Sequence, residues 1–328
     1  MRIRQIVAVL LMSGCCVAFA SDLRAQSGGR FALLIQGASG EEQYATLHRT
    51  WLDDLAGVLR DQFGYDAAAV TVLADQPKDG EARATAANVR TAVARLAGTL
   101  TPEDQLLLVF IGHGTGQDAD AKFNLIGPDL SVSDWRTLLE PVRATLVIVD
   151  TTSASYPYLS GLAAPGRVVV TATNSYAQRF HTVFPDAFVR ALTDADADHD
   201  KNGRISVLEA FTHASRLVAR HYEERGTMAT ESAVIDDTGD GKGRLATVEP
   251  PPNSPAALLY LNPPRAVASS DPETQKLVAR QQALTEQVDE LRRRQASMPA
   301  EEFARQFEAL LTELAEVSRE VRRRTGEN

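Results

Sequence analysis

The chain has 328 residues but only two cysteines, Cys15 and Cys16, and both lie close to the N-terminus. They fall in a segment laid out like a secretory signal, in which Arg2 and Arg4 precede an apolar stretch at residues 6–12. No thiol is left for the folded body. Cysteine catalysis and disulfide bonds are therefore excluded there.

Two small-residue sites follow the apolar stretch, Ala18-Phe19-Ala20 and Leu23-Arg24-Ala25, so residues 1–25 are predicted to be a signal peptide. The apolar stretch is too short to span a membrane. Met12-Ser13-Gly14-Cys15 loosely resembles a bacterial lipobox, and the alternatives are a lipid anchor at Cys15 and a retained N-terminal anchor. In each case we expect an exported protein, periplasmic or extracellular.

Positive charge is also scarce, because 34 Lys and Arg stand against 43 Asp and Glu, a formal charge of −9 at pH 7. Loss of Arg2 and Arg4 with the signal removes two positive charges and makes the charge −11. Such a surface argues against nucleic acid and anionic membranes as partners, and it is compatible with divalent cations. Hydrophobic residues at 44% predict a buried core.

From Arg30 onward, short apolar runs alternate with stretches of helical spacing. Strands are expected at residues 31–36, 69–73, 106–111, 146–149 and 168–171, with helical spacing at 47–59, 85–96, 135–139 and 184–192. Continuous apolar strands that alternate with helices predict an α/β domain over residues 26–249. Its sheet would be mostly parallel, with helices on both faces.

Proline marks the end of this domain, and residues 250–270 are predicted to be a linker with a short last strand at 256–261. Apolar residues at coiled-coil spacing then predict an antiparallel helical hairpin over 271–325. Its arms would be about 33 Å long, from roughly 22 residues at 1.5 Å each. Such a hairpin either packs on its own domain or serves as an oligomerisation or partner-docking arm.

The most specific local motif is a calcium loop of the EF-hand type at residues 198–209. Calcium in such a loop takes oxygen ligands at positions 1, 3, 5, 7, 9 and 12, with glycine at position 6 for the sharp turn. Gly203 is at position 6. The ligand positions hold Asp198, Asp200, Asn202, Arg204 through its carbonyl, Ser206 and Glu209. The sequence therefore predicts one Ca²⁺ site.

A second segment begins in the same way, with Asp236, Thr238 and Asp240 at positions 1, 3 and 5. Position 12 is Thr247, which cannot supply a bidentate carboxylate. A weaker second calcium site is one interpretation, and a turn held by Asp side chains is the other.

Candidate catalytic residues follow two predicted strands. The strand at 106–111 leads to His113 in a Gly-rich loop, and the strand at 146–149 leads to Asp150 and Thr152. Ligands of an open parallel sheet collect outside the carboxyl ends of its strands. We therefore expect His113 and Thr152 to face one cleft.

These residues resemble those of the caspase-like cysteine peptidases, most closely the bacterial legumain-like branch, over Arg30 to Gly243. His113-Gly114 matches the family's His-Gly strand end. Asp150-Thr151-Thr152 stands where the family has Asp-x-Cys, so Thr152 occupies the nucleophile position. The resemblance implies that His113 is the activating base and that Gly114 and Asp150 keep the backbone pattern of the site.

The expected function depends on the replacement of the family's thiol by the hydroxyl of Thr152. A hydroxyl needs a positioned base, and the β-branched Thr152 is stiff. We expect a pseudo-peptidase that binds a peptide or protein without cleaving it. Two alternatives remain, namely a hydrolase that uses Thr152 or Ser153 with His113 as base, and a structural or assembly protein that works through the hairpin.

Other polar and aromatic residues give weaker indications of function. His181 is interpreted as structural because it lies near Phe180 and Phe184. The other histidines, His48, His199, His213 and His221, show no zinc-like spacing. Tyr156, Pro157 and Tyr158 follow the nucleophile position, and they either line the cleft or pack as ordinary residues.

Overall fold

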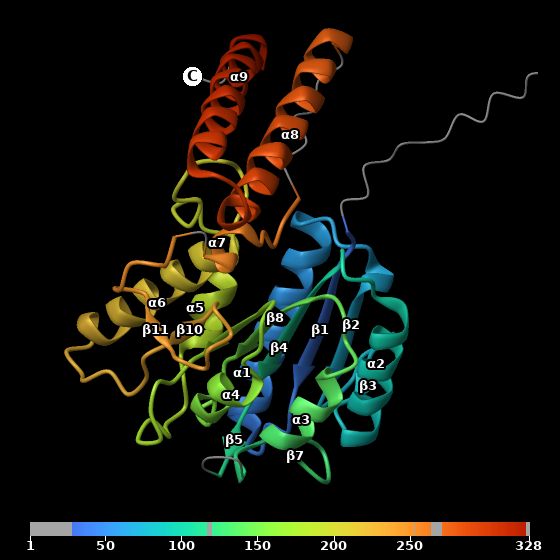
Figure 1. Ribbon diagram of the computed structural model, residues 1–328. Helices are drawn as coiled ribbons and strands as arrows, with labels where there is room; N and C mark the ends of the chain where they lie inside the picture. The colour runs from blue at the N-terminus through green and yellow to red at the C-terminus, as the bar shows by residue number, and fades with distance from the viewer. Residues whose placement is uncertain (1–27, 117–119, 253, 264–270, 326–328) are drawn as a thin grey trace, which may run out of the picture.

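The computed structural model describes residues 28–116, 120–252, 254–263 and 271–325. In this part of the chain a mostly parallel sheet carries helices on both faces, and two long helices project from one end (Figure 1). The predicted α/β class with a helical hairpin is confirmed. The predicted signal peptide and the cysteine for the lipid anchor lie outside the described residues.

The main sheet has eight strands in the order β11-β10-β9-β8-β4-β1-β2-β3. The last two strands in the chain, β10 and β11, are antiparallel to their neighbours, and the others run parallel. The strands are β1 Arg30–Gln36, β2 Val70–Ala74, β3 Ala82–Arg83, β4 Gln105–Ile111, β8 Thr145–Asp150, β9 Arg167–Thr171, β10 Val234–Asp236 and β11 Arg244–Leu245. A small second sheet contains β5 Gly114–Thr115, β6 Lys122–Phe123 and β7 Leu130–Ser131.

The central strands are apolar along their whole length because helices cover both faces of the sheet. In β1, Leu33 and Ile35 belong to one core, whereas Ala32 and Leu34 belong to the other. The core that contains Ala32 and Leu34 also includes residues of α1 Glu42–Gly57, α5 Phe184–Ala191 and α6 Val207–Glu224. The core that contains Leu33 and Ile35 includes residues of α2 Ala86–Thr99, α3 Val132–Leu139 and α4 Tyr156–Leu162. Two short turns, η1 Val58–Gln62 and η2 Ala67–Ala69, connect α1 to β2.

Local capping explains where several helices start. Thr85 accepts a hydrogen bond from the backbone N–H of Asn88 and begins α2. Ser131 and Ser206 each form a reciprocal capping box with the acidic residue three positions later, at the starts of α3 and α6. Each cap satisfies backbone N–H groups that have no partner within the helix.

The predicted strand at 256–261 is a short helix in the structure, α7 Pro255–Leu258, followed by a single bridge between Tyr260 and Ser206. Proline at the first helical position has its φ angle fixed near the helical value, which favours helix there. The Val207 N–H donates to the Leu259 carbonyl, so the segment still returns to the domain through backbone hydrogen bonds.

The hairpin consists of α8 Pro272–Arg293 and α9 Ala300–Thr325, joined by the short turn η4 Gln295–Ser297. Arg280 pairs with Glu313 and Gln281 bonds to Ser318, so residues early in α8 meet residues late in α9. The arms are therefore antiparallel, as predicted. None of the described helices is long and apolar enough to cross a membrane.

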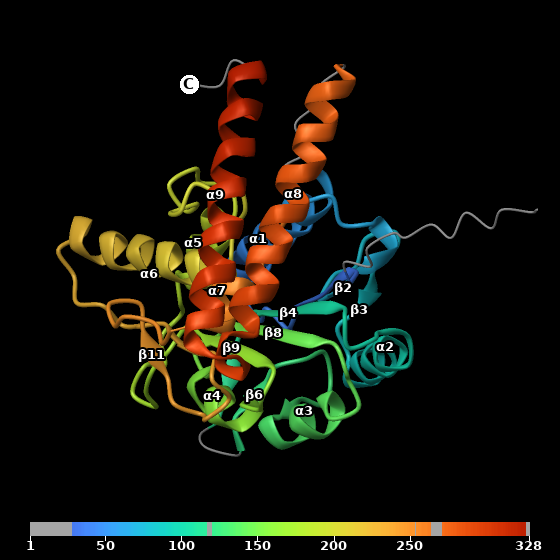
Figure 2. The ribbon, with the colours of Figure 1, turned by 45° about the horizontal axis from the view of Figure 1, so that its top comes forward.

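The hairpin rises from the end of the sheet where the central strands begin, opposite the small sheet that carries β5 and β7 (Figures 1 and 2). The hydrogen bonds agree with this placement. Gln105, the first residue of β4, donates to the Tyr260 carbonyl, and Tyr260 stacks under Arg204, whose guanidinium reaches Asp289 of α8. The carboxyl ends of the strands are thus free of the hairpin.

Candidate functional site

Two neighbouring strands deliver the candidate residues to the carboxyl edge of the sheet. β4 and β8 pair in parallel, and His113 and Thr152 each follow the last residue of one strand by two positions. The connections from β1 and β4 go to opposite faces of the sheet, because α1 packs in one core and α3 in the other. This divergence is the place where open α/β sheets bind ligands.

His113 is half-buried and belongs to an aromatic cluster. Its ring centroid lies 4.8 Å from that of Tyr44, 5.0 Å from that of His48 and 6.4 Å from that of His181. Burial lowers the pKa of His113 because it disfavours the charged imidazolium. His113 is therefore suited to remain neutral in this cluster.

His48 is the most buried member of the cluster, with 1% of its surface exposed. Burial lowers the pKa of His48 to about 3, and the neighbouring imidazoles of His113 and His181 lower it further. Its Nδ1 lies 3.3 Å from the hydroxyl oxygen of the buried Ser39. Sequence reasoning missed this cluster, because no spacing along the chain links three histidines that come from three separate segments.

The three histidines do not form a metal centre in this geometry. Among the described residues, the only group of three or more acidic, histidine or cysteine ligand atoms within 4.8 Å of one another is formed by Asp198, Asp200 and Glu209. His181 instead stacks on Trp51 at a centroid distance of 5.7 Å. Packing therefore accounts for this imidazole.

Thr152 has only 1% of its surface exposed. Its backbone N–H donates to Asp150 Oδ1 at 2.9 Å, but its side-chain Oγ1 has no hydrogen-bond partner among the described residues. A Cβ built on Gly114 would lie 3.0 Å from that Oγ1, so the hydroxyl points at the glycine backbone. The Thr152 hydroxyl is therefore closed off from solvent, and His113 does not hydrogen-bond to it.

Asp150 beneath it is fully buried. Burial raises the pKa of Asp150 to about 7, although the hydrogen bond from the Thr152 N–H opposes the shift. Oδ2 of Asp150 has no hydrogen-bond partner in the described part of the chain. This carboxyl group holds the strand end in place and does not reach solvent.

A cleft of about 290 Å³ opens beside these buried residues. It is lined by the residues directly after the two candidates, Gly114 and Ser153, and by neither His113 nor Thr152. Three segments that follow β4, β8 and β9 form it. The lining residues are Gly114, Thr115, Gly116, Ser153, Ala154, Tyr156, Pro157, Thr173, Ser175, Tyr176, Gln178 and Arg179.

The cleft is polar and carries one positive charge. Arg179 is its only charged lining residue among those described, and its Nε donates to the Tyr176 carbonyl at 2.8 Å. The rings of Tyr156 and Tyr176 meet edge to face at 5.1 Å. Tyr158, by contrast, lies in the core. The arrangement is suited to hold an anionic group beside two aromatic rings.

The loop at residues 198–209 brings three of its acidic side chains together. Oxygens of Asp198, Asp200 and Glu209 lie within 4.8 Å of one another. Burial raises the pKa of Asp200, and the negative charges of Glu209 and Asp198 raise it further. Gly203 has a φ of 77°, the left-handed value that the sharp turn at position 6 requires. Crowded carboxylates of this kind favour a bound cation.

The other predicted ligands of this loop are occupied locally. Oδ1 of Asn202 accepts from the Arg204 N–H at 2.8 Å, and the hydroxyl of Ser206 caps α6 together with Glu209. The Arg204 side chain turns away from the loop. Its guanidinium carbon lies 3.4 Å from the ring centroid of Tyr260, which leaves only its carbonyl for an ion.

The second acidic segment is arranged as a turn. The buried Asp236 accepts backbone hydrogen bonds from Thr238, Gly239 and Gly241 at 2.8 to 3.0 Å. Asp240 points outward and accepts from the Lys242 N–H. No set of three ligand groups gathers here among the described residues. The geometry favours the Asp-stabilised turn.

The sequence matches no protein-family model and no curated protein sequence. A crystal structure from Geobacter sulfurreducens aligns at 16% identity over 67% of this chain and 99% of its own, with a TM-score of 0.43. The Drosophila initiator caspase Dronc aligns at 10% identity over 66% of this chain and 82% of its own, with a TM-score of 0.42. These likenesses concern the fold alone.

Proposed function

We propose that this chain is an exported, calcium-binding pseudo-peptidase of the caspase and legumain type, which binds a peptide or protein segment without cleaving it. The burial of the Thr152 hydroxyl carries the proposal, because a nucleophile must reach its substrate and must lie within hydrogen-bond reach of a base. The cleft beside it remains open. Ser153 lines that cleft, but no base contacts it among the described residues.

The lining of the cleft favours an anionic peptide. Arg179 supplies a cation and no acidic side chain opposes it among the described lining residues, although the chain as a whole carries a formal charge of −9. Tyr156 and Tyr176 offer flat surfaces for an apolar neighbour of the anionic group. The class of ligand is thus a peptide that presents an Asp or Glu side chain or its terminal carboxylate.

Binding is tested with fluorescent peptides that carry Asp, Asn, Lys or Arg at one position, measured by polarisation in calcium. We expect the Asp peptide to bind best and Arg179→Gln to weaken it about tenfold, since one charge-assisted hydrogen bond contributes roughly 1.5–3 kcal/mol. Arg190→Gln is the matched control, because Arg190 is an exposed arginine on α5 that does not line the cleft.

The same peptides are followed by mass spectrometry for cleavage. Intact peptides throughout agree with the proposal. Turnover that disappears in both Thr152→Ala and His113→Ala would replace it with the hydroxyl hydrolase. Absence of peptide binding would remove the binding module and leave the assembly role of the hairpin.

Calcium binding rests on the three converging carboxylates of the loop at 198–209. Titration calorimetry should show one binding event, weak as in extracellular modules, with a dissociation constant of about 0.1 to 1 mM. Glu209→Gln keeps an oxygen that can cap α6 but removes the bidentate carboxylate, so the event should be lost. Asp196→Asn lowers the charge outside the loop and should retain it. No heat in the unmodified protein contradicts the site.

A further inference from the structure

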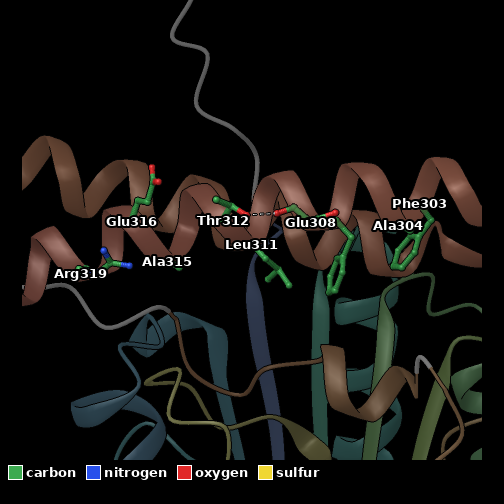
Figure 3. Close-up of a pocket in the computed structure, with 9 residues that line it drawn as sticks. Phe303, Ala304, Glu308, Leu311, Thr312, Ala315, Glu316 and Arg319 are labelled. Carbon is green, nitrogen blue, oxygen red and sulfur yellow. Dashed lines mark hydrogen bonds between the residues drawn. The ribbon is translucent and has the colours of Figure 1, made fainter.

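The hollow along α9 and the cleft at the strand ends differ in how they are walled. The hollow has a volume of about 640 Å³, and all nine residues that line it belong to α9 (Figure 3). The cleft has a volume of about 290 Å³, and the three segments that follow β4, β8 and β9 line it. The face of one helix cannot close on a ligand, whereas a cleft between separate segments opens when one of them moves.

One wall of the cleft is the segment at residues 174–181, which we call the wall segment. It contributes the lining residues Ser175, Tyr176, Gln178 and Arg179. Both of its ends are anchored to the domain. Before it, the Thr173 N–H donates to the Ser155 hydroxyl oxygen at 3.1 Å. After it, the Thr182 hydroxyl donates to the Thr151 carbonyl at 2.6 Å. Movement of the wall segment is therefore confined to the residues between these anchors.

Between the anchors, ring contacts join the wall segment to the domain. Several of its hydrogen bonds stay within the segment itself. The ring of Tyr176 meets that of Tyr156 at 5.1 Å. Phe180 is 65% exposed, so its ring does not hold the segment down. His181, the next residue, stacks on Trp51 of α1 at a centroid distance of 5.7 Å. His181 is therefore the contact between the far end of the wall segment and α1.

The surroundings of His181 suit a neutral imidazole. Its ring centroid lies 5.0 Å from that of Tyr44, 6.2 Å from that of His48 and 6.4 Å from that of His113. Its Nε2 is buried and has no hydrogen-bond partner among the described residues. Burial lowers the pKa of His181, and the charge of His113 lowers it further. A protonated ring carries an N–H on both nitrogens, so one of them would be buried here without an acceptor.

The charged groups around this ring do not compensate a proton on it. Glu41 raises the pKa of His113, but no carboxylate of the described residues raises that of His181. The buried Glu231 accepts from two N–H groups at the start of α5. Arg179, two residues before His181, already gives the wall segment a positive charge. A second positive charge on the segment therefore favours the state in which the ring reaches water.

We propose that His181 is a pH-sensitive switch: as a neutral ring it holds the wall segment of the cleft against α1, and as an imidazolium it releases the segment and weakens peptide binding. The consequence for the ligand rests on the proposed peptide binding, because the released segment carries Arg179, the cation of the cleft. Packing of the segment is complete above a pH of about 6.5, the ordinary pKa of an imidazole in water, and is lost progressively below it.

Hydrogen exchange of residues 174–181 measures the release directly. Between pH 7.5 and 5.5 we expect the opening constant, corrected for intrinsic exchange rates, to rise severalfold, with about tenfold as the limit for one imidazole. His181→Phe keeps a ring on Trp51 but takes up no proton, so it should lose this rise. His221→Gln is the matched control, because His221 packs beside Tyr222 on α6 and does not line the cleft.

Fluorescence polarisation with the Asp peptide at the same two pH values tests the effect on binding. Affinity should fall further at pH 5.5 in wild type than in His181→Phe, because less of the wild type then has its cleft wall in place. The peptide carboxylate, with an ordinary pKa of about 3.9, stays charged at both values. His48, with a pKa of about 3, stays neutral, and Asp150, with a pKa of about 7, titrates in both proteins.

His181→Gln, a second variant without a titrating ring, is measured alongside, and circular dichroism melts at pH 7.5 establish that the variants fold. Opening that does not change with pH in wild type, or that rises as much in both variants, would overturn the switch. Opening in acid with unchanged peptide affinity would contradict its control of the cleft. A peptide that binds at neither pH, beside a segment that still opens in acid, would remove the proposed function and support the switch.

Discussion

The buried histidine His48 gives the protein a specific response to acid. Its pKa in the folded state is about 3, against 6.5 for the free side chain, because burial and two neighbouring imidazoles disfavour the charge. As pH falls below about 6.5 the unfolded chain takes up a proton that the folded protein refuses. The stabilisation is therefore complete above that pH and is lost progressively towards pH 3.

His48→Gln should therefore destabilise the protein by an amount that depends on pH, because it removes the titrating group but keeps a polar partner for Ser39. The difference in free energy of unfolding between wild type and variant should be about 2 kcal/mol smaller at pH 5 than at pH 7, at about 1.4 kcal/mol per pKa unit. Urea unfolding of both proteins at the two pH values measures it. The comparison with wild type matters, because Asp150 is buried with a pKa of about 7 and contributes the opposite slope below that pH. A pH-independent difference contradicts the assignment.

At the scale of elements, one ion pair connects the loop at residues 198–209 to the hairpin. Arg204 and Asp289 are each 5% exposed, and their side chains meet at 2.8 Å. The same guanidinium stacks on Tyr260, whose carbonyl accepts from the first residue of β4. Loop, linker segment and hairpin are thus held at one point.

Arg204→Ala should release the hairpin, because it leaves the Asp289 carboxylate buried without a partner at a cost of about 3–5 kcal/mol. Hydrogen exchange of α8 should accelerate while the central strands stay protected. Arg280→Ala is the matched control: it breaks an exposed pair with Glu313, which contributes about 0–1 kcal/mol. Equal effects of the two substitutions would show that the buried pair does not hold the hairpin.

Across the whole molecule, the cleft and the hairpin lie at opposite ends of the sheet. The cleft is formed by loops after β4, β8 and β9, whereas the hairpin is anchored at the start of β4 (Figure 1). The loop at residues 198–209 lies on the hairpin side. The hairpin therefore leaves the cleft accessible.

Much of the fold follows from local pattern. The five strands predicted between residues 31 and 171 have their bounds within one residue, because continuous apolar runs suit strands that are covered on both faces. The sixth predicted strand, at 256–261, was wrong. The hairpin was predicted for a similar reason, since periodic apolar residues act over short distances. The short strands β10 and β11 were missed, because two or three residues carry no periodicity.

The sequence alone established that no cysteine follows Cys16, because composition does not depend on folding. Only the tertiary structure placed the Thr152 hydroxyl out of reach and gathered His48, His113 and His181 from distant segments. It also gave Arg204 a buried partner and left one side of α9 uncovered. Burial and contact between distant residues depend on how elements pack, and no local pattern encodes them.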